Sequence, residues 1–183
     1  MNRYRIAPER SRFAVHASAT GLLSAFAHSP TFAVSRFEGE VRLGMSAQSM
    51  ELELSVDPSS LVLEDRVSEH DRHEIEQRMW SEVLEIGRYR ELGYRGHAVR
   101  AELIDQGRYR LALEGDLTLH GMTAPHPIDA ELIVFADGLR LGGESMLRMS
   151  SFGIRPVTAV GGTIKLKDEL RFSFDLAALP KPS

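Results

Sequence analysis

Two histidines and a glutamate lie close together in one polar segment. His70 and His73 are three residues apart, and Glu74 comes four residues after His70. On a helix this spacing brings two imidazole nitrogens and a carboxylate near one point, where they could contact a metal ion. The run HEIEQ at 73–77 begins like the H-E-x-x-H motif of metalloproteases but lacks the second histidine. A metal site would need a further ligand from elsewhere, so the favoured interpretation is a solvated first helical turn.

Other chemistry has little support in the sequence. No G-x-S-x-G, P-loop or G-x-G-x-x-G motif occurs. His28 and His120 each lie in an expected turn, and neither has an assignable nucleophile and orienting acid. The absence of cysteine excludes disulfides, thiolate metal sites and cysteine nucleophiles. We therefore expect no catalysis and no cofactor. The alternative is a metal-assisted enzyme that acts on an apolar substrate through His70, His73 and Glu74.

Length and charge narrow the class of protein further. The 183 residues predict a single domain over 1–183, in which 180–183 form a short tail. With 22 basic and 26 acidic residues the net charge is −4, and no basic block suggests a nucleic-acid partner. No apolar run approaches the ~20 residues that span a bilayer. The first twenty residues lack the apolar core of a secretion signal, so we expect a cytoplasmic protein, or a periplasmic one if the sequence begins at a mature start.

Alternating apolar and polar residues predict strands along most of the chain. Such strands, mostly joined by short polar turns and without crossover helices, are typical of an antiparallel meander. Asp137-Gly138 predicts a type I′ hairpin turn, and Gln106-Gly107 is a weaker signal of the same kind. Closing about eight strands into a barrel would remove the exposed edges. The predicted strands are Arg12–Ser18, Phe32–Leu43, Met50–Val56, Leu92–Leu103, Tyr109–Leu119, His126–Ala136, Leu139–Met149 and Ile164–Leu176.

One segment has helical spacing instead. Ser68 followed by Asp71 resembles a capping box and predicts a helix over about 69–86. Its apolar side carries Ile75, Met79, Trp80, Val83 and Leu84. A single amphipathic helix in a barrel meander is expected to pack across an open end or a flank.

The apolar faces of these elements allow two interpretations. The side chains could interdigitate as a filled core, which patterning alone favours, or they could line a tunnel for an apolar ligand. The residues concerned are Phe13, Val15, Phe26, Phe32, Leu52, Leu54, Trp80, Leu111, Leu113, Phe172 and Phe174. Periodicity identifies the apolar face of a strand but does not show whether the space behind it is hollow.

Five segments, in this order, resemble the bacterial YceI-like lipid-binding family over about Tyr4–Leu176. They are the opening Tyr4–Phe13, the strand Phe37–Val41, the helix start Asp71–His73, the turn region Gly115–Pro125 and the late Ser151–Ile154. The resemblance implies a lipocalin-like, eight-stranded antiparallel barrel with a helix near one opening. It also implies that the interior holds a polyprenyl or quinone tail, which favours the tunnel and makes the apolar residues above its lipid-binding wall. Homodimers are common in barrels of this type.

A polar ligand head at the mouth would need one or two hydrogen-bond donors. Arg36, Arg72 and His73 are candidates because they flank predicted strand or helix ends. The leading hypothesis is therefore a non-catalytic carrier of an isoprenoid-type lipid. The alternatives are the metal-assisted enzyme and a stress-response module with a filled core that acts through its surface.

Overall fold

The computed structural model describes residues 1–20, 29–155, 158–159 and 164–181. Its α-helix is α1 (Glu69–Arg78), which continues as the π-helical turn η4 (Met79–Val83). Short 3-10 helices lie at Pro8–Arg10, Ala47–Ser49, Pro58–Ser60 and Met149–Phe152 (η1, η2, η3 and η5). The strands are β1 (Asn2–Ile6), β2 (Arg12–Thr20), β3 (Thr31–Val34), β4 (Phe37–Leu43), β5 (Glu51–Val56), β6 (Leu61–Leu63), β7 (Leu92–Asp105), β8 (Arg108–Leu119), β9 (Met122–Pro125), β10 (Ile128–Phe135), β11 (Gly138–Arg148), β12 (Thr158–Ala159) and β13 (Ile164–Pro180).

Eight of these strands close into a ring. The order is β1-β4-β5-β7-β8-β10-β11-β13, and β13 pairs again with β1 through contacts such as Tyr4 with Pro180. Every pairing in the ring is antiparallel. The strands β2, β3 and β6 extend the sheet beyond β13. The predicted eight-stranded antiparallel barrel with one helix is therefore confirmed.

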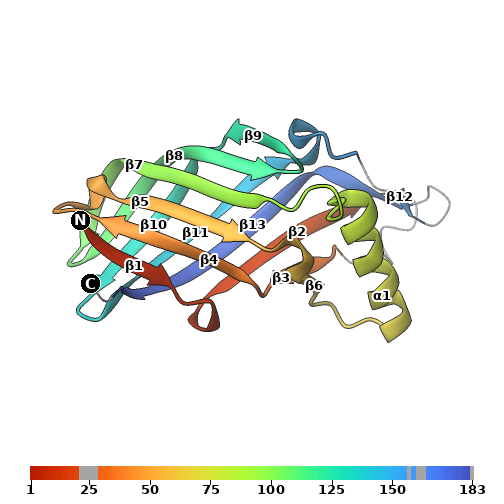
Figure 1. Ribbon diagram of the computed structural model, residues 1–183, viewed down its shortest axis with the longest axis horizontal. Coiled ribbons are helices and arrows are strands. Elements are labelled where there is room, and N and C mark those ends of the chain that lie inside the picture. Colours follow the sequence, from red (N-terminus) through yellow and green to blue (C-terminus); the bar gives the residue numbers. More distant parts are fainter. Residues whose placement is uncertain (21–28, 156–157, 160–163, 182–183) are drawn as a thin grey trace.

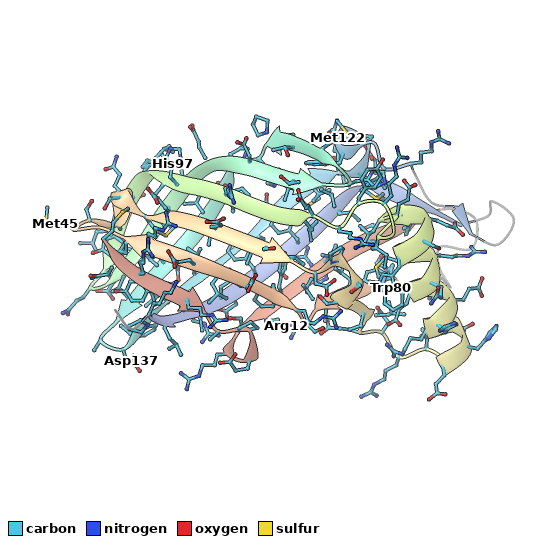
Figure 2. The ribbon with its side chains drawn as sticks, viewed as in Figure 1. Arg12, Met45, Trp80, His97, Met122 and Asp137 are labelled. Atoms are coloured by element: carbon cyan, nitrogen blue, oxygen red, sulfur yellow. The ribbon has the colours of Figure 1, made fainter. Side chains whose placement is uncertain are left out.

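The two ends of the barrel differ. In Figure 1 both chain termini lie at one end, while α1 lies across the other end and contacts β6. Figure 2 shows the turn residues Met45 and Asp137 at the terminal end and Trp80 beside the helix. The helix therefore covers one opening, which is one of the two placements that the sequence predicted for it.

The helix begins as predicted but ends earlier. The Ser68 hydroxyl accepts a hydrogen bond from the backbone N–H of Asp71, which caps the first turn. The backbone N–H of Leu84 bonds to the carbonyl of Met79, five residues back, so the last turn is wide. Glu85 has a φ of 45°, which ends the helical path before the predicted boundary at 86.

The predicted strand Phe32–Leu43 was wrong as one element. It divides at Ser35 and Arg36, whose backbone N–H groups bond to the carbonyl and hydroxyl oxygens of Ser60. β3 consequently pairs with β2 and β6, whereas β4 joins the closed ring. The strands β6, β9 and β12 have two to four residues, too few for alternation to reveal them.

The hairpin predicted at Asp137-Gly138 is shifted by one residue. Phe135 pairs with Gly138, so Ala136 and Asp137 form the turn, and Gly138 is the first residue of β11 rather than a residue with positive φ. The weaker signal was the more accurate one, because Gly107 lies in the turn with a φ of 72°.

A packed core fills the terminal half of the barrel. Its members have side chains with at most 1 % exposure and lie on strands, or directly before β5, near the turns of that end. They are Val41, Met50, Leu111, Leu113, Leu132 and Leu141. The filled interpretation of the apolar faces therefore holds for this half of the barrel.

Candidate functional site

A cavity of about 640 Å³ occupies the half of the barrel beneath α1. This volume lies within the ~300–1,000 Å³ of typical ligand pockets. Its wall comes from β2, β3, β5, β6, β7, β8, β10, β11 and β13, and on the covering side α1 contributes Ile75 and η4 contributes Met79. Apart from charged groups at the helix and the phenol of Tyr94, the described wall is apolar.

Seven of the predicted lipid-binding residues line this cavity. They are Phe13, Val15, Phe32, Leu52, Leu54, Phe172 and Phe174. Leu111 and Leu113 instead belong to the filled half. Trp80 packs against the core beside the cavity, and its indole N–H donates to the carbonyl oxygen of Leu61 at 3.2 Å. Phe26 lies outside the described residues.

The aromatic part of the wall follows from strand register. Phe172 and Phe174 of β13 pair with Val15 and Phe13 of β2. The rings of Phe13 and Phe172 meet edge to face with centroids 6.2 Å apart, and Phe13 contacts Phe37 in the same way at 6.1 Å. Alternation on two neighbouring strands thus gathers aromatic rings on one surface.

Simple alternation over Ile164–Leu176 would place Asp168 on the apolar face of β13, but the strand has a bulge at this point. The register with β2 shifts between Leu166 and Leu170, and both leucines line the cavity. Asp168 accepts hydrogen bonds from the backbone N–H and the hydroxyl of Ser150, and these lower its pKa. The carboxylate anchors η5 to the rim instead of entering the apolar interior.

Charged side chains line the cavity where α1 covers it. They are Asp71, Glu74 and Arg78 of the helix and Asp65 from the segment before it. Glu74 pairs with Arg78 at 3.4 Å, and Asp71 accepts a hydrogen bond from the Ser68 hydroxyl at 2.6 Å. Among the described lining residues, the mouth therefore carries three carboxylates and one guanidinium.

The predicted head-group donors have other partners or positions. Arg36 donates to Asp57 and Ser59, and the hydrogen bonds from Ser59 and then Arg36 lower the pKa of Asp57. Arg72 donates to the carbonyl oxygens of Leu63 and Asp65. His73 is exposed. The described wall includes none of the three predicted donors.

The predicted metal-binding set is only partly brought together. His70 and His73 are both exposed on α1, whereas Glu74 lines the cavity and pairs with Arg78. Within residues 1–20, 29–155, 158–159 and 164–181 there is no cluster of three or more His, Asp or Glu side chains arranged to hold a metal ion. The further ligand that the spacing required is therefore not supplied by the described chain.

His120 joins three segments at the rim. Its Nε2 lies 2.7 Å from a carboxylate oxygen of Glu85, and its Nδ1 lies 3.1 Å from the carbonyl oxygen of Phe152. The Tyr89 ring packs on the imidazole with centroids 4.2 Å apart. His120 and Gly121 have φ values of 53° and 73°, which is the type I′ geometry of a two-residue hairpin turn. The predicted turn role of His120 is confirmed, with the addition that it fixes the segment following α1.

Tyr94 is a site residue that the sequence analysis missed. It lines the cavity from β7, is 4 % exposed, and its hydroxyl has no hydrogen-bond partner among the described residues. Burial, with a smaller contribution from Asp116, raises the pKa of Tyr94 to about 12. Its inward position was visible in the alternation of Leu92, Tyr94 and Ala98, although the fate of its hydroxyl was not.

A closed antiparallel barrel that is filled at one end and hollow beneath a helix at the other defines a class of ligand-enclosing barrels. Residues 4–178 match the YceI-like domain, and the chain belongs to that family. The family resemblance of the five ordered segments is thus confirmed.

Related sequences and structures agree with this assignment. A UPF0312 protein of Vibrio cholerae serotype O1 is 41% identical over 64 residues, which cover 32% of this chain and 34% of that protein. This match spans about a third of the relative's length. Among solved structures, a polyisoprenoid binding domain from Saccharophagus degradans, implicated in plant cell wall breakdown, has a TM-score of 0.70 at 11% identity and covers 99% of this chain and 100% of its own.

Two further structures share the fold. Burkholderia cenocepacia BcnA has a TM-score of 0.69 at 13% identity, with 94% of this chain and 98% of that chain covered. A Campylobacter jejuni YCEI protein has a TM-score of 0.61 at 13% identity, with 81% and 84% covered. Helices long and apolar enough to cross a bilayer are absent from the described part of the chain.

Proposed function

We propose that this protein binds a long apolar lipid of the isoprenoid type, such as a polyprenyl or quinone tail, inside its barrel and carries or sequesters it without catalysis. The observation that carries the proposal is the cavity of about 640 Å³ with an apolar wall beneath α1. The name of the polyisoprenoid binding domain from Saccharophagus degradans, whose fold this chain shares, supports the same class of ligand.

Burial alone supplies the binding energy in such a site. Transfer of apolar surface from water stabilises the complex by ~25 cal/mol per Å², or about 0.8 kcal/mol for each buried CH₂ group. This attraction has no preferred direction, so the wall needs no reactive or hydrogen-bonding side chain. The aromatic surface formed by Phe13, Phe172 and Phe174 and the leucines around it suit a flexible, methyl-branched chain.

The charged side chains at the mouth of the cavity determine which head group the ligand can have. A chain that enters beneath α1 leaves its head group near Asp65, Asp71, Glu74 and Arg78. Three carboxylates against one guanidinium disfavour a phosphate and suit a neutral head such as an alcohol or a quinone.

The test is lipid uptake by the purified protein. Organic extraction and native mass spectrometry should detect a co-purified lipid, or a complex after incubation with geranylgeraniol. A Leu54→Trp variant places a large ring in the cavity and should lower geranylgeraniol binding by more than tenfold. The matched control is Leu103→Trp, because Leu103 is 63% exposed near the turn that follows β7 and does not line the cavity. A wild-type protein that carries no lipid and takes up no isoprenoid alcohol would refute the proposed function.

A further inference from the structure

The cavity ends abruptly along β7 and β8. On β8, Leu117 and Leu119 line it, whereas Leu113, the inward-facing residue beyond Gly115, does not. On β7, Tyr94 lines it, whereas Ala98 belongs to the filled core. Tyr94 and Leu117 pair across the two strands, so this one pair marks the depth at which the hollow half stops on this side.

Two glycines form a niche at that depth. Gly96 and Gly115 are direct partners across β7 and β8. A Cβ atom on Gly96 would lie 2.7 Å from both the Cε1 and the hydroxyl oxygen of Tyr94, and one on Gly115 would lie 2.6 Å from that oxygen. The phenol therefore lies over the glycine pair, in space that any other residue at these positions would occupy.

Beyond the niche, the inward side chains of β7 and β8 belong to the packed core. Leu113, two residues before Gly115 on the inward face of β8, is 1% exposed and pairs with Ala98. The phenol thus lies between the hollow half and the packed half of the barrel. Its hydroxyl oxygen is the phenol atom that a Cβ on Gly115 would meet, and it makes no hydrogen bond to a described residue, so shape is what this side chain contributes.

We infer that Tyr94 determines the length of apolar chain that the cavity accepts, by filling the niche over Gly96 and Gly115. This inference rests on the proposed function, because it concerns the far end of the same cavity. The phenol group has seven heavy atoms and an isoprene unit has five carbons, so removal of the phenol frees room for about one further unit. Burial of even two further CH₂ groups corresponds to roughly a tenfold gain in affinity.

The experiment is a competition among isoprenoid alcohols of increasing length. Wild type and Tyr94→Ala are each incubated with an equimolar mixture of geraniol, farnesol, geranylgeraniol and solanesol, and native mass spectrometry measures the ratio of bound alcohols. In Tyr94→Ala, compared with wild type, the bound ratio of a longer alcohol to the next shorter one is expected to rise by roughly tenfold for the pair that spans the length limit of the wild-type cavity. Tyr94→Phe, which retains the ring over Gly96, is expected to keep the wild-type ratios within about twofold.

Leu132→Ala is the control for loss of core packing, since Leu132 is 0% exposed and lies away from the cavity wall. It should lower stability without changing the ratios. If Tyr94→Ala does not fold, Tyr94→Leu should shift the ratios in the same direction, because leucine is too short to cover both glycines. If Tyr94→Ala, or Tyr94→Leu in its place, folds and gives the same ratios of bound alcohols as wild type, the inference is overturned, while binding by wild type still supports the proposed function. Failure of wild type to bind any alcohol would instead remove the proposed function itself.

Discussion

Replacing Tyr94 by Phe removes one buried atom and leaves the ring in place. The hydroxyl is enclosed and has no partner among the described residues, and an unsatisfied buried polar group costs about 1–3 kcal/mol. At neutral pH the variant is therefore expected to gain about 1 kcal/mol in free energy of unfolding. For a chain of this length that gain raises Tm by ~2–4 °C.

The same hydroxyl makes the free energy of unfolding depend on pH in the alkaline range. Burial raises the pKa of Tyr94 from 10.0 to about 12 in the folded protein. A raised pKa means that the folded state favours the neutral phenol, so the contribution is complete below about pH 10 and disappears as pH rises through about 12. Two pKa units correspond to about 3 kcal/mol in total, of which about 1 kcal/mol is lost between about pH 9 and about pH 11.

Urea denaturation of wild type and Tyr94→Phe at about pH 7, 9 and 11 measures both effects. The stability difference between the variant and wild type should grow by about 1 kcal/mol from about pH 9 to about pH 11. Tyr109→Phe is the matched control, because its side chain is partly exposed on the neighbouring strand β8. A Tyr94→Phe variant that is less stable at neutral pH, with a difference that does not change on the alkaline side, would refute the reasoning.

Two further predictions concern the rim of the cavity. His120→Ala removes contacts with Glu85, Phe152 and Tyr89 and should lower the free energy of unfolding, measured by urea denaturation, by about 2 kcal/mol. The control His97→Ala, on the exposed outer face, should change the free energy of unfolding by less than about 0.5 kcal/mol. Equal losses in the two variants would contradict the anchoring role of His120. The double variant Asp71→Asn, Glu74→Gln should raise the affinity for farnesyl phosphate relative to farnesol by roughly two- to fivefold at low salt, with the gain reduced at high salt. An unchanged affinity ratio would show that the carboxylates do not act on the head group.

Local pattern was sufficient for most strands and for the start of the helix. The alternation in β8 and β13 placed Leu111, Leu113, Phe172 and Phe174 on the inner face, because the side-chain period of a strand is two whatever surrounds it. The capping residue Ser68 acts within one turn of the chain and was equally readable. Features that depend on partners distant in sequence were missed, such as the division of β3 from β4 by Ser60.

For the site residues, too, local pattern predicted some features and only distant partners in the fold decided the others. Composition and alternation by themselves determined an antiparallel barrel with apolar inward faces and a helix beside it, since these follow from chain-local periodicity. The tertiary structure alone decided that Leu111 and Leu113 fill one half of the barrel while Phe13 and Phe172 line a cavity in the other half. The physical reason is that hollowness depends on what faces each side chain across the barrel, and strand pairing and closure bring those partners together from distant parts of the sequence.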